Sequence, residues 1–146
     1  MTSTKGTTAL HACAGAPVVF AACLLNLRAT VDALSTTAHA HLLLVCSGTF
    51  VEAAFEDVLA AGAVCAEVWE LYGAGASDGA IIARQVYELH KRDLEDAIGS
   101  GRNGRRLLSR PELADDVRFC ARVDSVKTVV RLVGGELKAE KPDSGS

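Results

Sequence analysis

Polar residues that could do chemistry stand where two apolar runs end. Asn26 follows the run Pro17–Leu25 (PVVFAACLL), and Ser47–Thr49 follow the run His41–Cys46 (HLLLVC). A side-chain amide, two hydroxyls and the backbone of a glycine turn can donate hydrogen bonds to an anion. The same residues also have structural uses, because Gly48 permits a tight turn and Asn26 can cap a helix. Spacing alone does not decide between these roles.

Acidic residues stand at the starts of two predicted helices. Asp57 lies near the first turn of a helix predicted over Ala53–Tyr72, and Asp78 opens a helix predicted over Asp78–Ile98. Carboxylates at loop edges are suitable Mg²⁺ ligands, but a helix dipole also stabilises negative charge at its N-terminus by roughly 0.3–1 kcal/mol. Metal binding and helix capping are therefore both open for Asp57 and Asp78.

A cysteine and a histidine are two further residues that could take part in catalysis. Cys46 ends an apolar run, but no HCx5R motif of cysteine phosphatases surrounds it. We therefore expect a packed small residue there rather than a nucleophile. His90 lies on an apolar helical stripe, which predicts a packed or half-exposed side chain.

The apolar runs predict the elements that position these residues. Both runs read as strands covered on two faces, and Leu27, Val31 and Leu34 form a helical stripe between them. Strand, helix and strand make the βαβ unit of a parallel sheet, where ligands gather at the carboxyl ends of the strands. We predict an α/β fold with a predominantly parallel sheet flanked by helices, and a site at Asn26 and the loop after Cys46.

The rest of the chain completes one predicted α/β domain, residues 1–137. A short helix is predicted over Gly104–Ser109, and strands over Asp116–Val123 and Thr128–Val133. Residues 138–146 are polar and contain proline and glycine, which predicts a disordered tail.

Composition argues against several classes of protein. A formal net charge of −3 provides no basic field for a nucleic-acid backbone, so no nucleic-acid partner is expected. A local group of arginines is predicted to be a solvated helix face, with an anion site as the alternative: Arg102, Arg105, Arg106 and Arg110. Five cysteines without CxxC spacing indicate reduced thiols. The run Ala16–Leu25 is too short to cross a bilayer, and we expect a cytoplasmic protein with no membrane partner.

Short motifs follow one another in an order that is itself informative. Cys46–Thr49 is similar to a CAGT motif, and Phe55–Ala63 (FEDVLAAGA) is similar to F-x-x-EDVLCAGA. Ser77–Ala80 with Ala83 is similar to SDAA-x-x-A. The other matches are Leu24–Asn26 with Ala29, then Ser100, Gly104 and Leu107 for S-x-x-G-x-x-L, then Asp116–Ala121 with Asp124 for DV-x-FCA-x-x-D. From Gly6 to Asp124 the chain thus resembles the 2-phosphosulfolactate phosphatase family.

The resemblance implies a Mg²⁺-dependent acid phosphatase that hydrolyses (2R)-2-phospho-3-sulfolactate to sulfolactate and phosphate, on a coenzyme M pathway. The implied substrate is a small phosphorylated sulfonate or a related phosphate monoester. The implied Mg²⁺ ligands are Asp57, Asp78 and Asp124, of which the first two are also assigned to catalysis. The implied substrate-binding residues are Gly6, Thr7, Asn26, Ser47, Gly48 and Thr49.

The chain also departs from the family pattern. Thr4–Thr7 (TKGT) resembles a T-N-G-T turn with Lys5 in place of asparagine, and Val130–Arg131 stands where the family often has Val-Pro. Family members are usually much longer, and their N-terminal V-x-D-V-L-R-A-T and G-E-R segments have no match here. We therefore expect the C-terminal part of the family fold, incomplete by itself.

Two hypotheses follow from this departure. The chain is either a phosphatase whose site is completed by a complementing N-terminal half, or a catalytically silent fragment or interaction subunit of the same fold. In both cases a sheet that lacks strands should expose an apolar edge that pairs with another chain, as a homo-oligomer or with that half.

Overall fold

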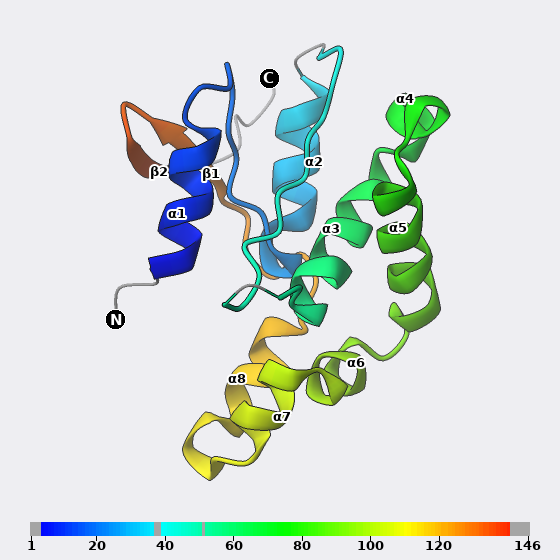
Figure 1. Ribbon diagram of the computed structural model, residues 1–146, viewed down its shortest axis with the longest axis vertical. Coiled ribbons are helices and arrows are strands. Elements are labelled where there is room, and N and C mark those ends of the chain that lie inside the picture. The colour runs from blue at the N-terminus through cyan, green and yellow to red at the C-terminus, as the bar shows by residue number, and fades with distance from the viewer. Residues whose placement is uncertain (1–3, 37–38, 51, 141–146) are drawn as a thin grey trace.

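The computed structural model describes residues 4–36, 39–50 and 52–140, and within these ranges helices dominate. The upper part of the molecule in Figure 1 contains the helices α1 (Thr4–Cys13), α2 (Leu27–Ser35), α3 (Phe55–Glu67), α4 (Trp69–Tyr72) and α5 (Asp78–His90). The lower part contains α6 (Leu94–Ser100), α7 (Arg102–Leu108) and α8 (Ala114–Cys120). Short 3-10 turns lie at Leu24–Asn26, Gly73–Gly75 and Pro111–Leu113.

A single apolar core joins the two parts. Leu59 of α3 and Val117 of α8 are almost completely buried in it. The other buried members of the core lie in α2, α3 and α6 and in the short segments beside α2 and α3: Leu24, Leu27, Val31, Leu34, Ala63, Val64, Val68, Leu94, Ala97 and Ile98. Small and branched aliphatic side chains fill this core, as the composition predicted.

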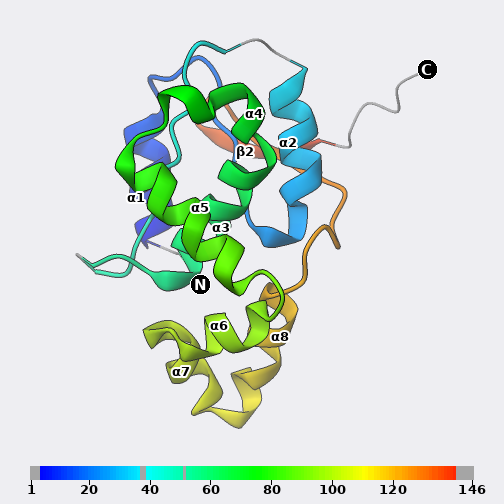
Figure 2. The same ribbon diagram turned by 90° about the vertical axis from the view of Figure 1, so that its right-hand side faces the viewer.

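Helices α3 and α5 pack side by side and run in opposite directions (Figures 1 and 2). Gly62 permits their close approach, because a Cβ atom there would lie 2.0 Å from the carbonyl oxygen of Ala83. Ser77 caps α5 by accepting a hydrogen bond from the N–H of Ala80 at 3.4 Å. Ser77, and not Asp78, is therefore the residue that caps this helix.

The two long predicted helices are each divided into two. The helix predicted over Ala53–Tyr72 is interrupted at Val68, whose backbone leaves the helical region at φ −103° and ψ 12°. The helix predicted over Asp78–Ile98 ends at His90, and Asp93 caps a new helix by accepting from the N–H of Asp96 at 3.1 Å. The second break returns apolar side chains to the core, because Leu94, Ala97 and Ile98 of α6 are buried there.

The predicted parallel sheet is absent from the residues that the structure describes. Pro17–Leu25 forms one isolated antiparallel bridge, between Phe20 and Arg131, and His41–Cys46 has no regular secondary structure. A strand needs backbone hydrogen bonds to a neighbour, and these two segments do not pair with each other. The α/β class holds, but its sheet is a small antiparallel hairpin of β1 (Val129–Val133) and β2 (Glu136–Glu140).

Two further predictions are wrong near the C-terminus. Asp116–Val123 was predicted as a strand, but Ala114–Cys120 is helix α8, because a short apolar pattern also fits one face of a helix with Val117 inward. Lys138–Glu140, predicted to be disordered, lies in β2, while residues 141–146 lie outside the described residues. Gly134 and Gly135 adopt positive φ angles of 61° and 84° and so form the two-residue turn of the hairpin.

The predicted final strand, the predicted short helix and the predicted packing of His90 are confirmed. The strand predicted over Thr128–Val133 corresponds to β1, and the helix predicted over Gly104–Ser109 corresponds to α7. His90 is half-buried and meets the ring of Phe55 edge to face, with centroids 5.6 Å apart. Among the described helices, none has the length and apolar character required to span a bilayer.

Candidate functional site

The loop between Cys46 and α3 forms a tight turn that depends on glycine. Gly48 has a φ of +68°, and a Cβ atom at this position would lie 2.7 Å from the carbonyl oxygen of Glu52. Thr49 and Glu52 exchange backbone hydrogen bonds of 2.9 and 3.2 Å across the turn. The tight turn therefore lies between Thr49 and Glu52, directly after the glycine of the predicted Ser47–Thr49 turn, and only glycine fits the conformation of Gly48 without strain.

Asp57, in the first turn of α3, holds this loop. One carboxylate oxygen, Oδ2, accepts a hydrogen bond from the N–H of Gly48 at 2.8 Å and another from the hydroxyl of Ser47 at 3.3 Å. A carboxylate of the chain thus occupies the place where an external anion would meet these two donors. Within the described residues, no hydrogen bond engages the other oxygen, Oδ1.

Two consecutive residues of α7 reach the same loop from about fifty positions further along the chain. The Arg102 guanidinium donates to the carbonyl oxygen of Thr49 at 3.2 Å and pairs with the carboxylate of Glu52. The amide of Asn103 donates to the hydroxyl of Thr49 at 2.8 Å and to the carboxylate of Glu56. The loop is therefore fixed from one side by α3 and from the other by α7.

Cys46 lies beside this network with an exposed side chain, so the packed residue predicted at this position is wrong. Its sulfur donates to the carbonyl oxygen of Asp57 at 3.5 Å. Partial desolvation by neighbouring atoms raises the pKa of Cys46, and the negative charge of Asp57 raises it further. Because the thiolate is the nucleophilic form, this environment opposes nucleophilic catalysis by Cys46.

Asn26 is buried and its amide is used within the fold. Its oxygen accepts from the N–H of Cys23 at 2.9 Å, and its nitrogen donates to the carbonyl oxygens of Ala21 and Thr128 at 3.3 and 3.2 Å. These bonds tie the start of α2 to the segment that precedes β1. Substrate binding by Asn26 stays a prediction, and it would require some of these bonds to break.

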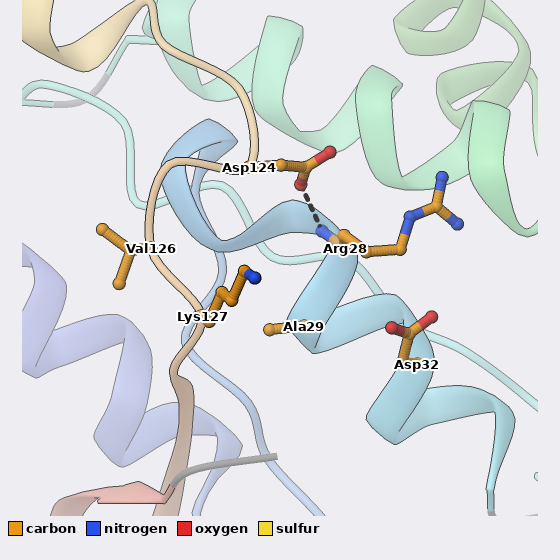
Figure 3. Close-up of a pocket in the computed structure, with 6 residues that line it drawn as sticks. All are labelled: Arg28, Ala29, Asp32, Asp124, Val126 and Lys127. Carbon is orange, nitrogen blue, oxygen red and sulfur yellow. Dashed lines mark hydrogen bonds between the residues drawn. The ribbon is translucent and has the colours of Figure 1, made fainter. Parts of the chain in front are cut away.

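Asp124 caps α2, as Figure 3 shows. Its carboxylate accepts from the backbone N–H of Arg28 at 2.6 Å, and its own φ is positive, 55°. It lines a shallow pocket with Arg28, Ala29, Asp32, Val126 and Lys127. The Arg28 guanidinium extends away from Asp124 and pairs with Glu67 at 2.9 Å.

The remaining predicted site residues lie on two other helices. Asp78 is exposed in the first turn of α5, and its carboxylate has no hydrogen bond or ion pair to another described residue. The turn predicted at Gly6 and Thr7 is wrong, because both residues lie in the first turn of α1. Substrate binding by these two residues stays a prediction.

The three predicted Mg²⁺ ligands do not form a cluster. Asp57 holds the loop, Asp124 caps α2 and Asp78 opens α5. In the described part of the chain, no three His, Cys, Asp or Glu side chains are grouped so that they could hold a metal ion. These residues by themselves therefore do not fit a Mg²⁺ site.

Sequence reasoning assigned no individual role to Asn103 and treated Arg102 as one of a surface group. Asn103 is the second residue of α7, and its sequence neighbours gave no signal of a contact with Thr49. For Arg102 the local concentration of arginines was a signal, and anion binding was the alternative considered for it. Only the packing of α7 against the loop identifies both residues.

Comparisons with known proteins agree with the motifs in this loop. The profile of the family described as 2-phosphosulpholactate phosphatase matches residues 1–135. This chain belongs to that family. A protein of Synechococcus sp. (strain JA-3-3Ab), named probable 2-phosphosulfolactate phosphatase, is 35% identical over 137 residues, which are 91% of this chain and 55% of that protein.

Two other family members, both with the same name, show a similar relationship. The protein of Pseudothermotoga lettingae is 34% identical, over 85% of this chain and 52% of its own length. The protein of Caldanaerobacter subterraneus is 30% identical, over 96% of this chain and 57% of its own length. The chain thus spans about half the length of the curated family members that it matches.

Proposed function

We propose that this chain forms part of a phosphatase that hydrolyses (2R)-2-phospho-3-sulfolactate to sulfolactate and phosphate. In this reaction water attacks phosphorus, the bond from phosphorus to the C2 oxygen breaks, and that oxygen takes up a proton. The observation that carries the proposal is the loop Ser47–Thr49, held by Asp57, Arg102 and Asn103 in a member of this family. A preorganised polar loop is what phosphoryl transfer requires of a protein.

Residues of this chain have separable roles in the proposed site. Arg102 supplies positive charge next to Thr49, where it would face an anionic phosphoryl or sulfonate group. Asn103 and Asp57 are positioning residues that fix the loop through its hydroxyl and N–H groups. The Oδ1 atom of Asp57 remains available for an additional contact within the described structure.

Mg²⁺ dependence is part of the proposal through the family resemblance alone. The carboxylates of Asp57, Asp78 and Asp124 do not converge, so we derive no catalytic step from a metal bound by them. If Mg²⁺ takes part, water, the substrate phosphate or the part of the family fold outside the match would supply the further ligands.

A catalytically silent subunit of the same fold is the second candidate function. It is favoured by the separation of the three aspartates and by the match to about half of each relative. In that case the hydrogen bonds of the loop stabilise an assembly. The substrate is not hydrolysed even when Mg²⁺ and the complementing polypeptide are added.

A phosphate-release assay on phosphosulfolactate tests the proposal. The chain is assayed alone and after addition of the part of the Synechococcus relative that lies outside the match, each with and without Mg²⁺. We expect activity in the complemented sample and its loss without Mg²⁺. If the complemented sample releases no phosphate in either condition, the phosphatase proposal is wrong and the silent subunit is favoured.

Variants assign the residues in the same assay. Arg102→Gln should lower kcat/KM by about tenfold or more, because a charge-assisted contact to the substrate is lost. Arg106→Gln on the same helix is the control, since the guanidinium of Arg106 forms no hydrogen bond or ion pair to a described residue, and the activity of this variant should be unchanged. Asparagine at position 57, 78 or 124 keeps size and removes charge, so a metal ligand should lose Mg²⁺-dependent turnover, whereas a cap should lose little stability.

A further inference from the structure

The segment His41–Cys46 has the side-chain pattern of a strand but not its pairing. Leu42 and Leu44 are half-buried and pack against the core, whereas Leu43 is 82% exposed and Val45 is 49% exposed. This alternation has the two-residue period of an extended strand whose faces point in opposite directions. One face of the segment is therefore covered by this chain, and the other is open.

The backbone of the same segment is also unsatisfied. From His41 to Cys46, no backbone hydrogen bond is formed with any residue that the structure describes. The extended segment near Phe20 differs, because Ala21 donates to the carbonyl oxygen of Val130 at 2.8 Å and Leu132 donates to that of Val19 at 2.9 Å. An apolar segment with free N–H and C=O groups is a template for a pairing strand.

We propose that His41–Cys46 is an internal sheet strand that is completed by polypeptide from the part of the family fold outside the match. Strands of that polypeptide pair with both edges of His41–Cys46, and the packing of that polypeptide covers Leu43 and Val45. The inference shares with the proposed function the assumption that the chain acts within the larger family fold. It does not depend on turnover.

The length of the relatives argues for this occupant. The matches cover only 52–57% of three relatives, so a large part of each relative has no counterpart in this chain. The composition of the segment agrees, because natural free edges usually carry Lys, Pro or a bulge, and HLLLVC has neither of these residues. A strand buried on both sides, in contrast, is typically a continuous apolar run.

The pairing is tested by hydrogen exchange and light scattering. The unmatched parts of the Synechococcus and Pseudothermotoga relatives are produced as separate chains and mixed with this chain. We expect a one-to-one complex with at least one of them, in which the amides of residues 42–45 exchange much more slowly than in the chain alone. Fast exchange in the mixture, or no complex with either partner, overturns the inference.

Substitutions on the open face distinguish specific binding at this surface from non-specific hydrophobic association. Leu43→Lys should weaken the complex by at least about tenfold, because burial of a leucine is lost. The matched control is Leu89→Lys on α5, where the leucine is 78% exposed and affinity should be unchanged. Because both positions are exposed, both variants should keep the circular dichroism spectrum and melting temperature of the parent chain.

The same measurements distinguish the other outcomes. A homodimer of the chain alone that Leu43→Lys dissociates would assign this face to a second copy and overturn the proposed occupant. A complex that protects residues 42–45 but releases no phosphate would support the inference while the phosphatase proposal fails. Full activity of the chain alone would support the phosphatase proposal and contradict the need for a completing strand.

Discussion

Asp57 determines the local chemistry of the candidate site at the residue scale. Its carboxylate accepts the N–H of Gly48 and the hydroxyl of Ser47, so these donors have a partner before any ligand arrives. A phosphate would therefore have to displace Asp57 or bind beside it, towards Arg102. Partial desolvation raises the pKa of the Cys46 thiol, and the same negative charge of Asp57 raises it further.

The influence of Asp57 on Cys46 can be measured by alkylation. In Asp57→Asn, the pKa of Cys46 should fall, because one cause of its elevation is removed while burial remains. The midpoint of the rate of Cys46 alkylation against pH should move to lower pH, as followed by peptide mass spectrometry. A looser loop alone would raise the rate at every pH without moving the midpoint, and Asp78→Asn should leave the profile unchanged.

At the scale of elements, the close contact of α3 and α5 sets the position of the loop. Asp57 is carried by α3, and α3 approaches α5 at Gly62, where no side chain fits. Helix α7 then reaches the loop through Arg102 and Asn103. A change in the packing of α3 should therefore disturb both the core and the site.

A pair of glycine substitutions tests this contact. Gly62→Ala should lower the free energy of unfolding by about 1–3 kcal/mol, because the new methyl group would meet the Ala83 carbonyl oxygen at 2.0 Å. Gly79→Ala in α5 is the control, since its nearest neighbour is 3.8 Å away and helix propensity should stabilise it by up to about 1 kcal/mol. Urea unfolding measures both, and equal stabilisation of the two variants would contradict the close packing.

For the whole molecule, several ionisable groups are held in their neutral forms. Burial raises the pKa values of the thiols of Cys46, Cys65 and Cys120 and of the hydroxyl of Tyr87. Nearby acids add to this for three of them: Asp57 for Cys46, Asp116 for Cys120 and Glu67 for Tyr87. Unfolding removes the desolvation of these groups, which is partial for the exposed Cys46 and Cys120, so they lose their protons more easily in the unfolded chain.

The free energy of unfolding should therefore decrease at alkaline pH. A pKa raised in the folded state gives a contribution that is complete below the unfolded pKa and is lost as pH rises through the folded pKa. The ordinary pKa is 9.0 for the thiols and 10.0 for the tyrosine, so the melting temperature should fall as pH rises beyond about 9. Cys65→Ala should flatten this dependence, and calorimetry that finds the same slope in both proteins would exclude Cys65 as a contributor.

Much of the fold was predictable where the apolar periodicity extended over many residues or where a turn or cap required a particular residue type. The stripes of α2, α3 and α5, the turn at Gly48 and the cap at Ser77 all follow from local residue preferences. Gly134–Gly135 after the β-favouring segment Val129–Val133 was also a readable turn signal, but β2 (ELKAE) consists mostly of residues that do not favour strands, and the predicted disordered tail overlooked the hairpin. The predictions for short segments were wrong, because the apolar pattern of DVRFCARV is compatible with a strand and with a helical turn equally well.

The sequence by itself determined the family, through ordered motifs, and the loop at which a site should form. Only the tertiary structure decided how its residues are used: Asp57 on the loop donors, Asp124 on α2, and Arg102 with Asn103 against Thr49. The sequence also left the pairing of His41–Cys46 undecided. An apolar run predicts that a segment is buried, but it does not predict which neighbouring segment covers it. Local propensities act between residues close in sequence, whereas these contacts join residues from nine to ninety-six positions apart.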